Sequence, residues 1–160
     1  MRWALCLLAV AQVALAADGE QKFFAIGEFQ LESGAAIREC RIGYRTYGAL
    51  NADKSNAVLF PAWFTGTSKV PEQYFGTGPA KMIDTSKYFV VAVDALANGV
   101  SSSPSNSASQ PRLAFPKITI RDMVNSQRRL ITEVFGIKQL HAVVGISMGG
   151  MQAFQWAVSY

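Results

Sequence analysis

Cysteine, histidine and charge are scarce in this chain. Its 160 residues include two cysteines and one histidine, and 16% are Asp, Glu, Lys or Arg. Cys6 lies in an apolar N-terminal stretch, so Cys40 alone remains once that stretch is removed, and it cannot form an internal disulfide. The usual Cys and His ligands of a zinc site are missing as well. We therefore expect no metal and no other cofactor.

The chain also lacks a basic cluster, an internal repeat and a long apolar run. Its net charge of +4 comes from scattered basic residues, so we expect no nucleic-acid partner. Half of the residues are hydrophobic, which is enough for the core of one globular domain.

The N-terminus has the layout of a secretory signal peptide. Met1-Arg2 supplies a positive charge, residues 3–16 are uncharged and mostly apolar, and Ala14-Leu15-Ala16 provides small residues before a cleavage site. The apolar run is short for a membrane span, which needs about 20 residues. We predict a signal peptide over residues 1–16, a partial domain over 17–160, export to the periplasm or the medium, and no membrane anchor after cleavage. A buried core helix is the alternative.

Several segments have the pattern of strands. Residues 23–31 and 36–47 alternate and are rich in β-formers, with Gly34 between them, which predicts an antiparallel pair. Cys40 lies in the second segment, so it is interpreted as a packed strand residue, with a nucleophilic cysteine as the alternative. Residues 57–60, 88–93 and 140–144 are short apolar runs, which are typical of strands buried in a parallel sheet.

Helical signals alternate with these strands. Thr119, with Asp122 three residues later, predicts a helix start, and Gly136 suits the end of that helix. A serine-rich loop over residues 98–111 precedes it, and a second helical pattern includes Met151 and Ala157. Strands that alternate with helices predict an α/β fold, with a mostly parallel sheet and helices on both faces.

A G-x-S-x-G motif follows the last predicted strand and opens the last predicted helix. Ser147 is its centre, with Gly145 and Gly149 on either side. This context predicts a nucleophile elbow, in which a strained turn lifts the serine above the sheet and only glycine fits two residues away. The Met148 N–H at the helix start is one half of an oxyanion hole, and residues 61–66 are expected to supply the other half. The alternatives are a structural glycine-rich turn and a phosphate-binding turn.

No catalytic base for Ser147 is apparent. His141 lies six residues earlier along the same strand, roughly 20 Å away at about 3.3 Å per residue, so it cannot serve. The triad acid and histidine of this fold follow the serine in the chain. Asp94, at the end of a buried strand, is expected to anchor a loop, or else to line the mouth of the site. Asp122 is expected to stabilise the start of its helix.

The chain resembles the homoserine O-acetyltransferase family of α/β-hydrolase-fold enzymes, in motifs that cover nearly all of residues 30–160. The motifs are Tyr44-Arg45-Thr46-Tyr47-Gly48 with Leu50-Asn51, Asn56-Ala57-Val58-Leu59, Thr65-Gly66, Tyr88-Phe89-Val90-Val91, Gly99 through Asn106, Phe115 through Asp122, and Gly145 through Trp156. The resemblance implies the N-terminal half of an α/β-hydrolase fold, truncated after the elbow. The family's aspartate and histidine belong to a C-terminal half that this sequence does not include.

The resemblance also implies a ping-pong acyl transfer. Ser147 would take an acyl group from a small ester or acyl donor, while the Met148 and Phe64 N–H groups hold the oxyanion. Pro61-Ala62 departs from the family, whose biosynthetic members usually have His-Ala there. Export separates the protein from cytoplasmic acyl-CoA, so an exported ester hydrolase is our refined hypothesis.

The alternative is a catalytically inactive exported remnant, or a binding protein, that lacks the triad Asp and His. An open reading frame beyond codon 160 that carries both residues would distinguish the enzyme from the remnant. By itself, the 160-residue chain is expected to show little triad-dependent activity and to fold poorly, because the sheet would keep an unpaired edge. A cooperative thermal melt of residues 17–160 would contradict that expectation.

Overall fold

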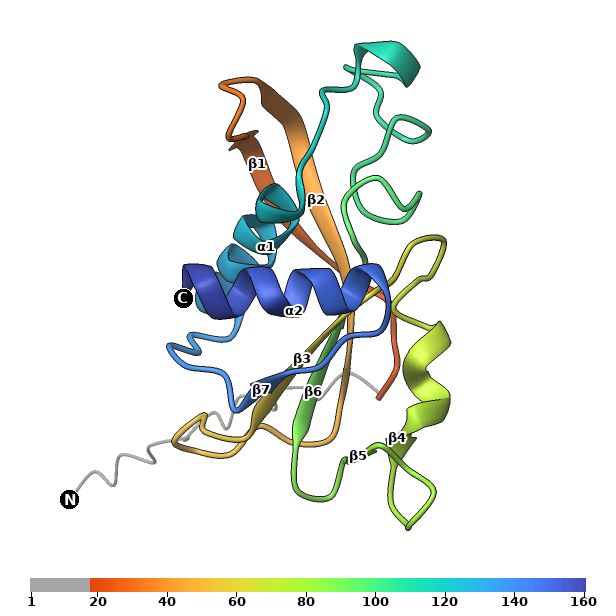
Figure 1. The fold of residues 1–160 in the computed structure, drawn as a ribbon, viewed down its shortest axis with the longest axis vertical. Helices are drawn as coiled ribbons and strands as arrows, with labels where there is room; N and C mark the ends of the chain where they lie inside the picture. The colour runs from red at the N-terminus through yellow and green to blue at the C-terminus, as the bar shows by residue number, and fades with distance from the viewer. Residues whose placement is uncertain (1–17) are drawn as a thin grey trace, which may run out of the picture.

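A computed structural model describes residues 18–160 (Figure 1), and the predicted signal peptide lies outside the described residues. The elements in chain order are β1 (Lys22–Gln30), β2 (Ala36–Tyr47), β3 (Ala57–Pro61), η1 (Val70–Tyr74), β4 (Phe75–Gly76), β5 (Ile83–Asp84), β6 (Phe89–Val93), η2 (Arg112–Ala114), α1 (Ile120–Arg129), η3 (Leu130–Val134), β7 (Ala142–Val143) and α2 (Met148–Ser159). Both predicted helices and all five predicted strands are present, and most strand ends shift by at most one residue, but β7 keeps only two of the five residues predicted for it.

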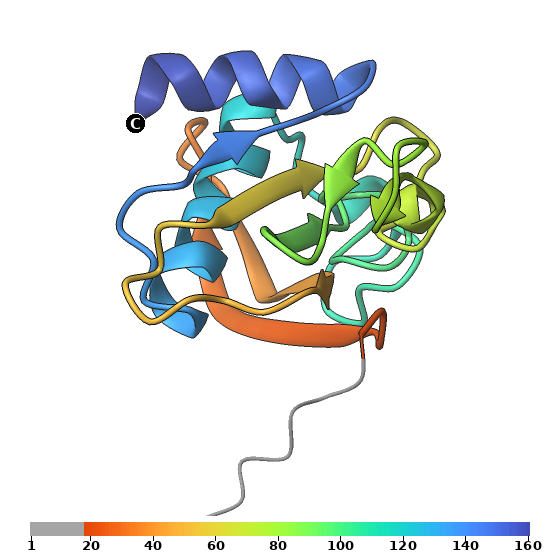
Figure 2. The ribbon, with the colours of Figure 1, turned by 90° about the horizontal axis from the view of Figure 1, so that it is seen from below.

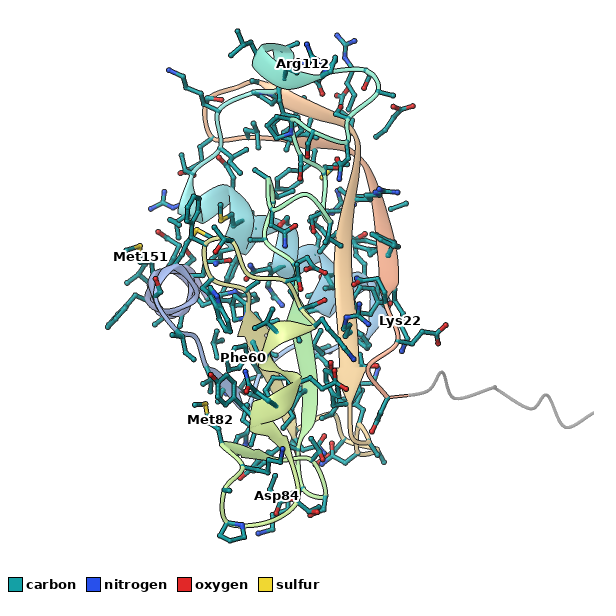
Figure 3. The ribbon with its side chains drawn as sticks, turned by 90° about the vertical axis from the view of Figure 1, so that its right-hand side faces the viewer. Lys22, Phe60, Met82, Asp84, Arg112 and Met151 are labelled. Carbon is teal, nitrogen blue, oxygen red and sulfur yellow. The ribbon has the colours of Figure 1, made fainter. Side chains whose placement is uncertain are left out.

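The main sheet has five strands in the order β1-β2-β6-β3-β7. β1 pairs with β2, and β2 with β6, in antiparallel fashion, whereas β3 pairs in parallel with both β6 and β7. This part of the sheet is therefore mixed. The molecule is elongated, with Arg112 near one end and Asp84 near the other (Figure 3).

The two faces of the sheet are covered differently. Alternate residues of β3 and β6 face two separate hydrophobic clusters. One cluster contains side chains of α1, η3 and α2, and the other contains Phe75 and Ile83 of the short strands β4 and β5. Within the described residues both α-helices thus lie on one face (Figures 1 and 2), so the prediction of helices on both faces is wrong for this part of the chain. The segment between β3 and β6 forms only a 3₁₀ turn and two two-residue strands instead of a helix.

The β1–β2 hairpin closes as the sequence predicts. Gly34 has φ 82°, a conformation that favours glycine. The N–H of Leu31 donates to Ala35 O at 2.8 Å, and the N–H of Gly34 donates to Leu31 O at 3.0 Å. The pairing register shifts around Gly27, where a bulge bends β1.

The serine-rich loop is an ordered part of the fold. β6 stops pairing with β2 near Gly43, whose N–H donates to Ser101 Oγ at 2.9 Å. The Arg41 N–H donates to Ser102 Oγ at 2.9 Å. Ser101, Ser102 and Ser103 are all buried. Serine hydroxyls therefore satisfy β2 backbone donors beyond the end of β6.

The start of α1 is a capping box. Thr119 Oγ1 accepts from the Asp122 N–H at 3.1 Å, and Asp122 Oδ2 accepts from the Thr119 N–H at 2.9 Å. Asp122 Oδ1 also accepts from the Glu32 N–H at 2.9 Å, which ties α1 to the β1–β2 hairpin. Asp122 thus has the structural role that the sequence predicts. A π-helical turn, η3, follows α1, and the chain leaves it at Gly136, which has φ 62°.

Among residues 18–160, no helix is both long enough and apolar enough to cross a membrane.

Cys40 is a packed core residue, as its position in an alternating strand predicts. It is buried in β2, and this burial raises the pKa of its thiol from 9.0 to about 11. A buried thiol with a raised pKa has the properties of a structural cysteine, which supports the packing role over the nucleophilic alternative.

The raised pKa makes folding stability depend on alkaline pH. Below pH 9 the thiol is protonated in both states and the full stability is present. Between pH 9 and about 11 only the unfolded chain loses its proton, so the free energy of unfolding should fall, by about 2–3 kcal/mol in total. Urea melts from pH 8 to 11 should show the difference between the native protein and Cys40→Ala narrowing as pH rises. Parallel curves for the two proteins would contradict the assignment.

Candidate active site

Ser147 lies on a strained turn between β7 and α2. It has φ 55° and ψ −123°, a conformation that L-residues rarely adopt. Such strain costs about 1–3 kcal/mol and persists where the surrounding structure enforces it. The Ser147 side chain is exposed rather than buried in the core. The local geometry is thus the strained strand–turn–helix connection that the motif predicts for a nucleophile elbow.

Two close backbone contacts explain the flanking glycines. A Cβ on Gly145 would lie 2.1 Å from Gly149 O, and a Cβ on Gly149 would lie 2.5 Å from Pro61 O. The sequence predicts the first contact, because residues two before and two after the serine approach each other. The second contact comes from β3, so Gly149 is required by the neighbouring strand as well as by the turn.

Near the start of α2, one hydroxyl and one backbone amide lack hydrogen-bond partners within the described residues. Ser147 is the N-cap residue, yet its hydroxyl makes no capping hydrogen bond. Within the described residues the Met148 N–H has no acceptor, as expected for the first residue of a helix. Both groups lie at the N-terminal, positive end of the α2 dipole, where negative charge is stabilised.

A tight turn after β3 carries the second proposed oxyanion donor. The Gly66 N–H donates to Trp63 O at 3.0 Å, which closes a turn over Phe64 and Thr65. Thr65 has φ 65°, where glycine or asparagine is usual, so this turn is strained as well. The Phe64 side chain is exposed, and its N–H has no acceptor among residues 18–160.

Asp94 anchors the loop that carries this turn. Its buried carboxylate accepts from Ser68 N–H at 2.8 Å and from Ser68 Oγ at 2.7 Å. It also accepts from Gln21 Nε2 and Asn98 Nδ2, both at 3.1 Å. The Asp94 side chain thus joins three segments, which is the anchoring role that the sequence predicts.

His141 lies at the other end of β7 from Ser147. Its N–H donates to Ala57 O at 2.8 Å at the start of β3, and its ring packs 4.8 Å from the ring of Tyr88. It borders a polar cavity together with Lys54 and Lys138. The one histidine of the chain is therefore separated from the elbow, as predicted, and residues 18–160 supply no base for Ser147.

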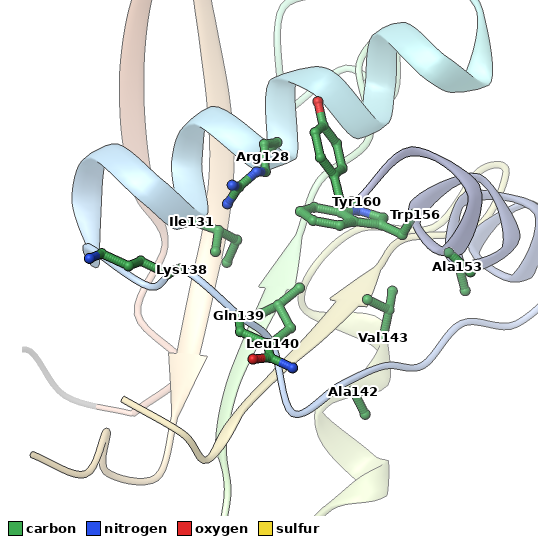
Figure 4. A pocket seen from close by; sticks show the side chains of 11 residues that line it. Arg128, Ile131, Lys138, Gln139, Leu140, Ala142, Val143, Ala153, Trp156 and Tyr160 are labelled. Carbon is green, nitrogen blue, oxygen red and sulfur yellow. The ribbon is translucent and has the colours of Figure 1, made fainter. Parts of the chain in front are cut away.

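An apolar cavity of about 420 Å³ lies apart from the elbow. It is lined by α1, η3, β7 and the C-terminal half of α2, with Leu140, Trp156 and Tyr160 among its walls (Figure 4). None of its walls comes from the elbow or from the loop after β3. Hence this cavity is not the candidate active site.

A buried side-chain amide near the elbow was not singled out from the sequence. Gln152 is fully buried in α2, and its Nε2 donates to Ala62 O at 3.0 Å. One signal was available, because Gln152 and Trp156 are four residues apart and share a helix face. A glutamine on the buried face of an apolar helix requires a specific polar partner.

Comparisons with known proteins agree with this geometry. The family described as alpha/beta hydrolase fold matches residues 56–160. Ethyl acetate hydrolase of Pseudomonas veronii is 48% identical over 137 residues, which are 84% of this chain and 39% of that protein. Homoserine O-acetyltransferase of Methanococcoides burtonii is 43% identical over 150 residues, which cover 84% of this chain and 30% of that protein.

Solved structures include relatives of the same kind. The acetyl esterase MekB superposes with a TM-score of 0.84 at 46% identity, and the match covers 89% of this chain and 41% of that one. The chain therefore spans about two fifths or less of the length of these relatives.

Proposed function

Because the chain belongs to the α/β-hydrolase-fold family, as its sequence predicts, we propose that Ser147 is the nucleophile of an acyl-transfer reaction. The Ser147 oxygen bonds to the carbonyl carbon of an ester while its proton passes to a base. The negative charge that develops on the carbonyl oxygen is held by the Met148 and Phe64 N–H groups. The carbon–oxygen bond to the alcohol then breaks, and the alcohol leaves with the proton.

The acyl group is then transferred to water. A water oxygen bonds to the acyl carbon, its proton returns through the base to the Ser147 oxygen, and the carboxylic acid departs. We propose that the base and its orienting acid are residues outside this chain, because His141 lies at the other end of β7. We place them in the region equivalent to the part of the relatives that lies outside the match.

One observation carries the proposal. Ser147 is exposed at positive φ on a turn that two backbone contacts make specific for glycine, and its hydroxyl makes no capping bond. A structural turn would gain from a capping hydrogen bond and would gain nothing from the strain. A phosphate-binding turn needs no hydroxyl held in this conformation.

Short acyl esters are the proposed substrates, and hydrolysis is the proposed outcome. Matches with 46–48% identity are named ethyl acetate hydrolase and acetyl esterase, which supports a small acyl group. The signal-peptide pattern of residues 1–16 supports an exported protein, kept apart from cytoplasmic acyl-CoA. Transfer to homoserine is therefore the less favoured outcome.

The product of the gene that encodes this chain can test these proposals directly. It should hydrolyse p-nitrophenyl acetate without coenzyme A, and p-nitrophenyl octanoate more slowly. A fluorophosphonate probe should label the peptide that contains Ser147. The activity should be found in the periplasmic or extracellular fraction, on a protein whose N-terminus is Ala17.

Other results would lead to different conclusions. Strict dependence on acetyl-CoA would show that the protein is a transferase and not a hydrolase. A cytoplasmic protein that retains Met1 would refute export. Absence of both hydrolysis and labelling would favour the inactive exported remnant or binding protein.

A further inference from the structure

Gln152 is a buried polar residue in the middle of α2. It is 0% exposed, between half-buried or exposed helix residues such as Met151 and Ala153. Burying an amide without hydrogen bonds destabilises a protein, and an apolar residue would fill the same space without that cost. The presence of glutamine therefore points to a role for its hydrogen bonds.

The direction of the Gln152 amide is fixed by its neighbours. The Trp156 indole N–H can only donate, and it donates to Gln127 Oε1 at 2.8 Å. Gln127 must then present its NH₂ group to Gln152 Oε1. The Gln152 NH₂ group is left to face Ala62 O at 3.0 Å and Met148 O at 3.2 Å.

These last two bonds link the segments that carry the proposed oxyanion donors. Met148 supplies one N–H itself, and Ala62 is two residues before Phe64, which supplies the other. The contact between Gly149 and Pro61 O prevents the two segments from moving closer, but it does not prevent them from separating. A hydrogen bond from Gln152 to Ala62 opposes separation.

The remaining attachments of the loop act from other directions. The Ala62 N–H donates to Val93 O at 2.9 Å, Asn98 Nδ2 donates to Gly66 O at 3.2 Å, and Ser68 is held by Asp94. These attachments tie the loop to the end of β6 and the segment that follows it, and they leave the distance between the loop and α2 unset. We propose that Gln152 is a positioning residue that sets the spacing between the Phe64 and Met148 N–H groups. This inference rests on the proposed acyl transfer.

The substitution Gln152→Met tests the role, because methionine has a similar length and no hydrogen-bonding amide. In the product of the intact gene, we expect kcat for p-nitrophenyl acetate to fall about 10–100-fold, with KM within about twofold. Oxyanion donors act on the transition state more than on the bound ester, so their misplacement should reduce kcat selectively. Affinity for a short alkylboronic acid, which forms a tetrahedral adduct with serine, should fall by a similar factor.

The control is Val124→Ala, a core substitution in α1 at a fully buried residue outside the site. It should lower the melting temperature at least as much as Gln152→Met and leave kcat within about twofold. If kcat falls equally in both variants, Gln152 has only a structural role and the inference is overturned.

Crystal structures of the native protein and Gln152→Met give a readout that does not need activity. We expect the distance between the Phe64 and Met148 nitrogens to increase in the variant. An unchanged distance would overturn the inference, whatever the kinetics. An increased distance in a protein without esterase activity would support the positioning role and refute the proposed function.

Discussion

Replacing Ser147 by alanine is expected to lower kcat for ester hydrolysis by about 10⁵–10⁶-fold, as loss of the nucleophile does in other serine enzymes. The fold should survive, because the hydroxyl makes no capping hydrogen bond and alanine meets the same backbone strain. The melting temperature should therefore stay within a few degrees of the native value. Steady-state assays with p-nitrophenyl acetate and thermal melts of the same preparations check both statements.

Ser159→Ala is the matched control for this variant. Ser159 lies at the other end of α2, where its hydroxyl accepts from Gln155 Nε2 at 2.8 Å. The control should keep native activity and react with the fluorophosphonate probe, whereas Ser147→Ala should do neither. A Ser147→Ala protein that keeps more than a few percent of native activity would mean that another group is the nucleophile.

The second large effect is expected from Gly145→Ala. The added methyl group would lie 2.1 Å from Gly149 O and 2.2 Å from Gly149 C. Gly149 cannot move away from the added methyl group, because it already packs closely against Pro61 O. The elbow must therefore open, and we expect a loss of about 3–5 kcal/mol in the free energy of unfolding, in the range of severe overpacking and backbone strain. Activity should fall more than about 1,000-fold, because the nucleophile and the Met148 donor move together.

Gly150→Ala provides the contrast, with the same added atom a few residues away. Its methyl group would meet nothing closer than Gly145 O at 3.4 Å, an ordinary contact. Alanine also favours a helix by up to about 1 kcal/mol relative to glycine. Urea melts should therefore show Gly150→Ala at native stability or slightly above it. Equal destabilisation by the two variants would show that the helix start, rather than the close approach at Gly145, limits stability.

Local patterns predicted the elbow and the elements around it. The spacing of Gly145, Ser147 and Gly149 after an apolar run was sufficient, because the turn depends on contacts between near neighbours in the chain. The capping box at Thr119 and Asp122 was predictable for the same reason. Such features depend on residues within a few positions of one another.

Features that depend on distant parts of the chain were not predicted. Residues 62–88 have no strong periodicity, so the sequence did not show that a 3₁₀ turn and two short strands would cover one face of the sheet. The run of serines was correctly predicted as a loop, yet its bonds to Arg41 and Gly43 follow from the end of β6. Tertiary contacts determined both outcomes.

In the candidate site, too, features that depend on distant parts of the chain were not predicted. Asp94 was expected to anchor a loop, but its partner Ser68 lies 26 residues earlier and could not be identified from spacing. The link from Gln152 to Ala62 joins residues 90 positions apart. Sequence patterns therefore identified the proposed nucleophile, while the side chains that hold its surroundings emerged only from the fold.

The contact between Gly149 and Pro61 O limits how a protein of this kind can evolve. No side chain lies between Gly149 and Pro61 O. A substitution at Gly149 therefore cannot enlarge the site without disrupting the elbow. Under the proposed function, new substrate preferences must then arise at exposed side chains near the elbow, such as those of Phe64, Ile146 and Met151. Directed evolution should vary those three positions and leave the backbone junction unchanged.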